Sequence, residues 1–266
     1  PENLDINLDY SNILSSVGKK TESIKILKNL ENKKDSRVFY NLGCLYMDTD
    51  KPTDAIESLK KTLELDPENK QASFNIGVCL FNTKNYEKTI KVFQAYQKQF
   101  GVNFEAERYI SLSFYSLNNL EDAEKSLKLL CNIKPQDSSI WYDRAIILEN
   151  MNHNIDAIHC YLKTLELVPD FNDAFKRLAT VYQKLGKLSE LIEVYELEKE
   201  KDKDNHITYS FLSQAYLLNE QSEKSIEYIE KAMDLYLSKN NDKNNNTYLD
   251  YLLIKGLIYQ NIEGSE

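Results

Sequence analysis

The histidines and cysteines are the side chains with which this sequence could bind a metal ion. His153, Asp156, His159 and Cys160 follow one another closely, and imidazole, thiolate and carboxylate groups are the usual ligands of zinc. The two histidines, however, are six residues apart, whereas neighbours on one helix face are about three or four residues apart. We therefore predict no metal site, and nothing else in the sequence indicates a cofactor.

The cysteines and glycines also argue against catalysis. Cys44, Cys79, Cys131 and Cys160 include no Cys-x-x-Cys pair, so they indicate neither a zinc ribbon nor a small disulfide framework. The glycines are isolated, so there is no phosphate-binding loop, and no Ser-His-Asp or Cys-His arrangement can be placed. We predict that the protein is not an enzyme. Unpaired thiols favour a reducing compartment, and we expect the cytoplasm.

Composition narrows the classes of partner. The chain has 266 residues, 42% of them hydrophobic, with only seven glycines and five prolines, so it can be helical throughout. Its net charge is −9, and it lacks the basic clusters that bind nucleic acid or an anionic membrane. No window reaches the roughly 20 apolar residues of a membrane-spanning helix. The sequence starts with Pro1, which fits an excised fragment whose targeting segment has been removed.

The elements that carry these side chains repeat with a period of 34 residues. Pro135 and Pro169 lie 34 residues apart, Pro67 lies 68 residues before Pro135, and each proline closes an apolar segment. This period divides the chain into seven units, predicted at residues 4–35, 36–69, 70–103, 104–137, 138–171, 172–205 and 206–237. A polar loop is predicted at 238–246 and a last helix at 247–262.

The eighth position of each unit tests this register, because it is small throughout. It holds Ser11, Gly43, Gly77, Ser111, Ala145, Ala179, Ser213 and, in the last helix, Gly256. The eleventh position is always large, the twentieth is mostly small, and the twenty-fourth is bulky and apolar, as in Tyr46, Ala55 and Leu59. These positions place one apolar stripe on each of two successive helices. Neither stripe can be buried within one unit, so neighbouring units must stack.

This pattern resembles the tetratricopeptide repeat, which has the same period. The fifth unit carries the resemblance best, at Trp141, Ala145, Leu148, Ala157, Tyr161 and Pro169. The resemblance implies an all-α fold, a right-handed superhelical solenoid of about seven helix–turn–helix repeats plus a C-terminal helix. The match covers about residues 4 to 262 and implies a single repeat domain over 1–266.

A few residues depart from the repeat pattern. Arg144 and Lys255 occupy the usually aliphatic seventh position, and Glu198 occupies the usually small twenty-seventh. Gly101 and Lys203 stand where proline is expected. These residues weaken single junctions without changing the period, and the stem of Arg144 can cover apolar surface while its charge stays in water.

The resemblance also implies where a partner binds. In the family, positions 2, 5, 6, 9, 12 and 13 of the first helices line a concave groove. Positions 5 and 6 give the candidate groove residues, namely Tyr40, Asn41, Phe74, Asn75, Arg108, Tyr109, Tyr142, Lys176 and Arg177. In the family, asparagines at position 6 hydrogen-bond an extended peptide. The segment Tyr40-Asn41-Leu42-Gly43 is, however, near the family's average sequence, so its asparagine is also expected in repeats that bind no ligand. The family's carboxylate-clamp pattern for chaperone tails is matched only at Asn75.

We therefore predict a scaffold or adaptor whose groove binds a peptide or helix of a partner protein. Arg108, Lys176 and Arg177 suggest a ligand with apolar anchors and one or more carboxylates. Two alternatives remain open, a structural subunit of a larger assembly and the regulatory arm of a longer protein. Neither nucleic acid nor membrane insertion is expected, and the sequence leaves the oligomeric state, the pathway and the partner undetermined.

Overall fold

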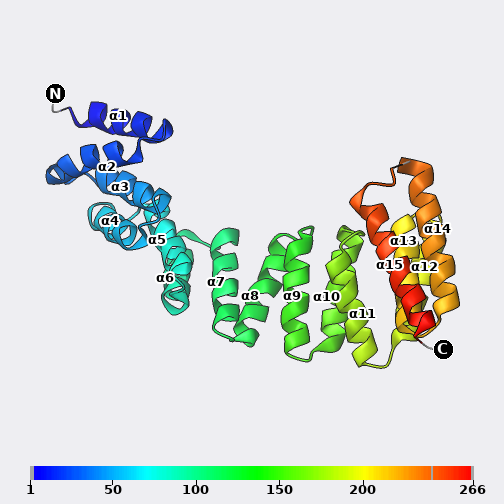
Figure 1. The fold of residues 1–266 in the computed structure, drawn as a ribbon. Coiled ribbons are helices and arrows are strands. Elements are labelled where there is room, and N and C mark those ends of the chain that lie inside the picture. The colour runs from blue at the N-terminus through cyan, green and yellow to red at the C-terminus, as the bar shows by residue number, and fades with distance from the viewer. Residues whose placement is uncertain (1–2, 241, 265–266) are drawn as a thin grey trace. The chain divides into compact units, whose positions relative to one another are not determined.

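The computed structural model describes residues 3–240 and 242–264, and those residues form fifteen α-helices and no strand (Figure 1). The all-α class predicted from the sequence is confirmed. The helices fall into two compact units, one up to Lys134 and one from Pro135 onward. The single array over 1–266 stays a prediction.

The helices alternate between first and second helices of the predicted repeats. The N-terminal unit contains α1 (Leu4–Ser16), α2 (Lys20–Asn29), α3 (Ser36–Asp48), α4 (Pro52–Leu65), α5 (Lys70–Asn82), α6 (Tyr86–Phe100), α7 (Phe104–Ser116) and α8 (Leu120–Ile133), with a short 3-10 helix at Glu31–Lys33. The C-terminal unit contains α9 (Ser138–Asn150), α10 (Asn154–Leu167), α11 (Asn172–Lys184), α12 (Leu188–Lys201), α13 (His206–Leu218), α14 (Ser222–Asn240) and α15 (Asn246–Glu263).

The polar stretch 238–246 is less irregular than the sequence predicts. Helix α14 continues to Asn240, and α15 already begins at Asn246. Two contacts hold the last turn of α14, since Lys239 donates to the Asp204 carbonyl at 2.9 Å and Asn240 donates to the Tyr236 carbonyl at 3.2 Å. A loop remains at 242–245, and residue 241 lies outside the described residues.

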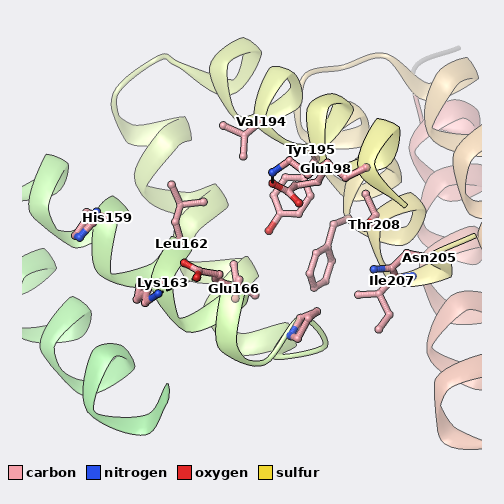
Figure 2. Close-up of a pocket in the computed structure, with 14 residues that line it drawn as sticks. His159, Leu162, Lys163, Glu166, Val194, Tyr195, Glu198, Asn205, Ile207 and Thr208 are labelled. Atoms are coloured by element: carbon pink, nitrogen blue, oxygen red, sulfur yellow. Dashed lines mark hydrogen bonds and ion pairs between the residues drawn. The ribbon is translucent and has the colours of Figure 1, made fainter. Parts of the chain in front are cut away.

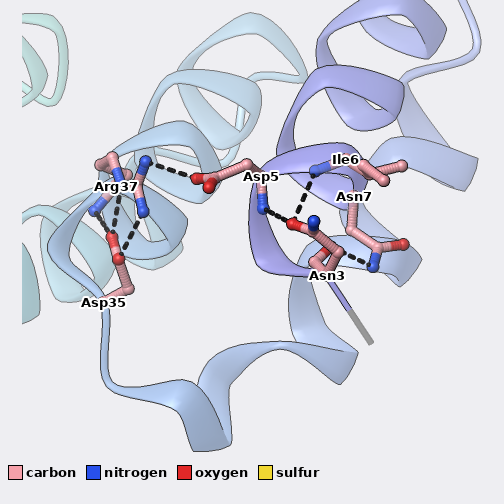
Figure 3. A network of polar contacts seen from close by, with 6 residues as sticks. All are labelled: Asn3, Asp5, Ile6, Asn7, Asp35 and Arg37. Atoms are coloured by element: carbon pink, nitrogen blue, oxygen red, sulfur yellow. Dashed lines mark hydrogen bonds and ion pairs between the residues drawn. The ribbon is translucent and has the colours of Figure 1, made fainter. Parts of the chain in front are cut away.

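Most first helices begin at an Asn or Asp that caps them. These residues are Asn3, Asp35, Asn69, Asn103, Asp137, Asn205 and Asn245, and each side chain accepts a hydrogen bond from a backbone N–H of the first turn. Figure 3 shows the first of them, where Asp5 also accepts from Arg37 at 2.8 Å. Arg37 donates to Asp35 as well and lowers the pKa of that carboxyl. The starts of α1 and α3 are thereby joined.

The turn between the two helices of each repeat has one backbone conformation. Position 15 of every repeat has a positive φ, at Gly18, Asp50, Lys84, Asn118, Asn152, Gly186 and Glu220. The next N–H along the chain donates to the carbonyl of position 11, as from Lys51 to Tyr46 and from Asn85 to Leu80, both at 2.8 Å. This is a helix C-terminal cap in which one residue adopts the left-handed conformation and the free carbonyls of the last turn are hydrogen-bonded. Because it recurs in every repeat, each second helix starts from the same backbone geometry.

The small residues at position 8 lie where the two helices of a repeat cross. A Cβ on Gly43 would come within 2.6 Å of Leu59, and one on Gly77 within 2.5 Å of Phe93. In two other repeats the crossing is polar, because Ser11 bonds to Ser23 at 2.7 Å and Ser213 donates to the Ser225 carbonyl at 2.7 Å. The helices therefore approach as closely as the small residues predict.

Repeats stack through the second helix of one and the first helix of the next. Within the units this holds for α2 and α3, α4 and α5, α6 and α7, α10 and α11, α12 and α13, and α14 and α15. Successive first helices also touch, at α5 and α7, α11 and α13, and α13 and α15. Each unit is thus a helical repeat solenoid, whose first helices share one side.

Candidate binding trough on the first helices

The two candidate asparagines of the N-terminal unit contact the preceding first helix. Asn41 on α3 donates to the Asn12 side chain on α1 at 3.4 Å, and Asn75 on α5 lies 3.8 Å from the Cys44 sulfur on α3. An amide has two N–H groups and an acceptor oxygen. Each asparagine therefore braces adjacent repeats and keeps further hydrogen-bonding capacity.

Tyr40 lies beside this contact and is half-buried. Burial, together with the neighbouring Cys44, raises the pKa of Tyr40 to about 12. Its hydroxyl is therefore protonated at neutral pH and can donate one hydrogen bond.

Phe74 and Tyr109 belong to an aromatic cluster that joins α5, α6 and α7. Tyr109 stacks on buried Phe93 with centroids 5.2 Å apart, and Phe74 meets Phe93 edge-on at the same distance. The rings are half-buried, so they hold the repeats together as well as forming surface. Arg108, next to them on α7, is exposed.

In the C-terminal unit, Arg177 on α11 is held by a carboxylate. It pairs with Glu149 of α9 at 3.3 Å, and the Tyr161 hydroxyl donates to the same Glu149 oxygen at 2.5 Å. Burial and this hydrogen bond raise the pKa of Tyr161. Tyr142 packs against Phe171 with centroids 4.7 Å apart. Arg177 is thus paired within the protein, although its side chain remains 44% exposed, and Lys176 beside it is also exposed.

Lys176 lies in a trough formed by three consecutive first helices, α11, α13 and α15. The trough consists of two hollows of about 390 and about 250 Å³, which share Lys176, Gln214, Ile254 and Leu257. We call it the first-helix trough. Its side chains include Leu217 and Leu253 as apolar groups and Thr180 and Gln183 as polar ones.

The trough residues occupy the positions that the family assigns to its groove. Lys176, Ser210 and Leu253 are at position 5 of their repeats, and Thr180, Gln214 and Leu257 are at position 9. Of these six residues, only Lys176 is among the predicted groove residues, because those were taken from positions 5 and 6 of the second to sixth repeats. Reading both positions 5 and 9 on α11, α13 and α15 would have found them.

A histidine lines the larger hollow of the trough. His206 begins α13, and its Nδ1 lies 2.7 Å from the Tyr251 hydroxyl on α15. Its ring also meets Tyr236 of α14 edge-on, with centroids 5.3 Å apart. Burial, and then the charge of Lys239, lower the pKa of His206, whereas Asp170 opposes that shift.

A second cavity lies on the side of the second helices, between α10, α12 and the start of α13 (Figure 2). It has a volume of about 460 Å³, and its apolar lining includes Leu162 and Tyr195. Its rim charges pair with one another, Lys163 with Glu166 at 2.8 Å and Lys201 with Glu198. Glu198, which departs from the usually small position 27, lines this cavity, and the sequence analysis did not predict the cavity.

The histidines and cysteines do not gather into a site. Among the described residues, no three His, Cys, Asp or Glu side chains are placed to hold a metal ion. His153 and His159 are exposed, and the His159 ring lies edge-on to Trp141 with centroids 6.3 Å apart. Over the same residues, no helix has both the length and the apolar character needed to cross a bilayer.

Comparison with known proteins identifies the repeat. Profiles of the tetratricopeptide repeat match residues 40–104, 174–206 and 207–239. A tetratricopeptide-repeat-containing protein of Methanocaldococcus jannaschii is 24% identical over 213 residues, which cover 73% of this chain and 36% of that protein. The anaphase-promoting complex subunit CDC16 of Saccharomyces cerevisiae is 21% identical over 215 residues, which cover 78% of this chain and 25% of the subunit. The chain thus spans about a third or less of these relatives.

Solved structures show the same fold. The C-terminal part of a tetratricopeptide-repeat-containing protein from Cytophaga hutchinsonii matches with a TM-score of 0.61 at 17% identity, over 92% of this chain and 99% of that one. MamA from Desulfovibrio magneticus matches with a TM-score of 0.57 at 18% identity, over 63% of this chain and 96% of that one.

Proposed function

Because this chain is a tetratricopeptide-repeat protein, we propose that it is a non-catalytic scaffold that binds a segment of a partner protein in the first-helix trough. The observation that carries the proposal is the convergence of positions 5 and 9 from α11, α13 and α15 on one hollowed surface. Pockets between helices are usual binding sites for apolar groups flanked by a few polar ones. The four cysteines form no disulfide, which supports a reducing compartment such as the cytoplasm.

The lining indicates the chemistry of the bound segment. Leu217, Leu253 and Leu257 offer apolar surface for aliphatic or aromatic anchors. Gln214 is half-buried, and its amide can both donate to and accept from a peptide backbone. Lys176 is an exposed cation that can receive a carboxylate, whereas Arg177 already pairs with Glu149.

In the N-terminal unit, the remaining hydrogen-bonding groups of Asn41 and Asn75 and the charge of Arg108 are proposed as further contacts. Asn41 and Asn75 face the preceding first helix, which their hydrogen bonds reach. The aromatic rings of Phe74 and Tyr109 supply the adjoining apolar surface.

A peptide library displayed on phage tests the proposal, because such a selection does not require the partner to be identified. Selection against the 266-residue chain should enrich peptides with apolar anchors, and their Kd would be measured by calorimetry. We expect Leu253→Asp and Gln214→Ala to weaken them, and Glu193→Ala, at an exposed site on α12, to leave them unchanged. Selected peptides that bind all variants equally would place the binding surface elsewhere.

A structural subunit is the second candidate function, favoured by exposed apolar side chains on α1 and at its C-terminal cap. Ile6, Tyr10, Ile13 and Val17 form one stripe and are 65%, 51%, 59% and 63% exposed. One relative is, by its name, a subunit of a complex, and large exposed apolar stripes mark interaction surfaces. Sedimentation of the purified chain separates the two functions, because a scaffold should be monomeric and a structural subunit should self-associate. If the chain self-associates through this stripe, Ile13→Asp should return it to the monomer.

A further inference from the structure

The second cavity, between α10, α12 and the start of α13, contains two buried hydroxyl groups. Tyr195 and Thr208 both line it, and their side chains belong to residues that are only 6% and 7% exposed. Within residues 3–240 and 242–264, neither hydroxyl makes a hydrogen bond, and neither oxygen is sealed in the interior. Figure 2 shows the Tyr195 hydroxyl pointing into the cavity. Both groups are therefore free to bond to a molecule that enters it.

The packing of the repeats does not require these hydroxyls. Thr208 is at position 3 of its repeat, and in the five preceding repeats that position holds an apolar residue that is at most 3% exposed, namely Val38, Ala72, Ala106, Ile140 and Ala174. Tyr195 is at position 24, where Leu27, Leu59 and Phe93 are 0% exposed without any hydroxyl. Tyr161, the other tyrosine at position 24, differs because its hydroxyl donates to Glu149.

The two hydroxyls are set among apolar walls. These walls are formed by Leu162, Leu165, Val194, Ile207 and Phe211. A buried hydroxyl that lacks a partner is unfavourable, because it has given up hydrogen bonds to bulk water. A ligand that bonds to it restores that interaction, and the volume of about 460 Å³ is in the range of pockets that hold small molecules.

The charges around the cavity indicate an uncharged ligand. The four charged side chains of its lining form two pairs, Lys163 with Glu166 and Lys201 with Glu198. Burial, and then the charge of Glu198, raise the pKa of Tyr195, so its hydroxyl is protonated at neutral pH. A neutral hydroxyl can donate one hydrogen bond and also accept. The buried polar groups therefore suit a neutral polar group rather than an ion.

We propose that the second cavity binds an uncharged, largely apolar small molecule, whose polar group hydrogen-bonds to the hydroxyls of Tyr195 and Thr208. An extended peptide is a poorer match, because each of its residues brings a backbone N–H and C=O that need partners, whereas the cavity offers two hydroxyls among apolar walls. The site is distinct from the first-helix trough, with which it shares only Ile207 and Phe211.

Phenols test the proposal, because each places one hydroxyl on an apolar ring. A series from phenol through para-ethylphenol to naphthol is titrated into the 266-residue chain with isotopically labelled methyl groups. In NMR spectra, we expect saturable shifts at Leu162, Leu165 and Val194, and none at Leu253 or Leu257 of the trough.

Two matched ligands test the recognised chemistry. Ethylbenzene, which lacks the hydroxyl, should bind roughly three- to tenfold more weakly than para-ethylphenol. The anion para-hydroxyphenylacetate should also bind more weakly, because its charge loses hydration in the cavity.

Two isosteric variants test the hydroxyls themselves. Tyr195→Phe and Thr208→Val should each weaken para-ethylphenol roughly three- to tenfold and leave the affinity for ethylbenzene unchanged. Tyr195→Phe should also keep the Tm of the original chain, because its hydroxyl has no partner to lose within the part of the chain that the structure describes. Tyr161→Phe is the matched control, which should lower the Tm through Glu149 and leave phenol binding unchanged.

Three results would overturn the proposal. The first is that no phenol of the series shifts the methyl signals of the second cavity. The second is that ethylbenzene binds as tightly as para-ethylphenol, or that both variants bind para-ethylphenol as the original chain does, since the hydroxyls would then recognise nothing. The third is that the shifts occur only at Leu253 and Leu257, which would place the phenols in the trough.

Discussion

Glycine and serine at position 8 solve the same packing problem by different chemistry. Gly43 and Gly77 leave room for the side chains of Leu59 and Phe93. Ser213 instead donates to the Ser225 carbonyl, and Ser225 donates back to the Ser213 carbonyl at 2.8 Å. Both arrangements bring the two helices of a repeat into close contact. Each position-8 residue therefore fits the residues that face it on the second helix of its own repeat.

The glycines give a matched pair of stability predictions. Gly77→Ala should destabilise the protein by about 1–3 kcal/mol, because the new Cβ would overlap buried Phe93. Gly256→Ala should stabilise it by about 0.5–1 kcal/mol, because alanine is the better helix former and nothing opposes its Cβ. Urea unfolding of both variants measures the difference. Shifts of the same sign would refute the assigned register.

The paired serines allow a double-mutant test. Ser213→Ala alone should cost about 1–3 kcal/mol, because it leaves buried Ser225 without one of its partners. The double variant Ser213→Ala, Ser225→Ala should recover most of this loss, since Ala145 and Ala157 occupy the same positions in the fifth repeat and are both 0% exposed. Additive losses in urea unfolding would show that the hydroxyls do not act as a pair.

His206 makes stability depend on pH. Its pKa in the folded protein lies below the ordinary 6.5, so the unfolded chain binds the proton more tightly. Stability should therefore fall as the pH falls from about 7.5 to about 5.5. His206→Gln should reduce this dependence, and His153→Gln, at an exposed residue, should not. The urea midpoint at the two pH values is the measurement, and identical slopes for His206→Gln and wild type would contradict the account.

At the scale of elements, the backbone conformation at position 15 is the same in all seven repeats, although the residue type there varies. All seven repeats place a left-handed residue there, but only Gly18 and Gly186 are glycine. The other repeats tolerate Asp50, Lys84 and similar residues because the next N–H along the chain is fixed to the position-11 carbonyl. The hydrogen bonds at the end of the first helix thus determine the turn conformation. The residue type at position 15 changes only the conformational free energy of its positive φ.

This gives a second matched pair of substitutions. Lys84→Gly should stabilise the protein by about 1 kcal/mol, because glycine adopts a positive φ without the steric cost of a side chain. Gly186→Ala should destabilise it by about the same amount. Thermal unfolding followed by circular dichroism is sufficient, since both sites lie on the surface. A lower Tm for Lys84→Gly would show that Lys84 makes a contact that outweighs its backbone cost.

At the scale of the molecule, stacking by nearest neighbours explains what could be predicted. The first helices α3, α5, α7, α9, α11 and α13 begin at the first residues of the predicted repeats, because the crossing at position 8 recurs with the chain's own period. The engagement of Asn41 by Asn12 and of Arg177 by Glu149 was not predictable. Those contacts depend on which side chain the preceding repeat presents at positions 9 or 12, and the period carries no information about that pairing.

The trough was predicted only in part for a related reason. Its third wall is α15, whose repeat lies beyond an irregular stretch and therefore outside the regular period. Lys176 was found because it lies in a regular repeat, whereas Leu253 and Leu257 were not considered. The break in the register accounts for these two residues, whereas Thr180, Ser210 and Gln214 lie in regular repeats and were left out because positions 5 and 9 were not read there.

Photocrosslinking from the trough is the most direct test of the scaffold function. A benzophenone side chain replaces Gln214, which lines both hollows, or Glu193, which is exposed on α12, in cells of the source organism. We predict a covalent adduct with a protein partner from position 214 that is lost when Leu253→Asp is added, and none from position 193. Adducts that form from position 193 but not from 214, or that persist with Leu253→Asp, would contradict binding in the first-helix trough.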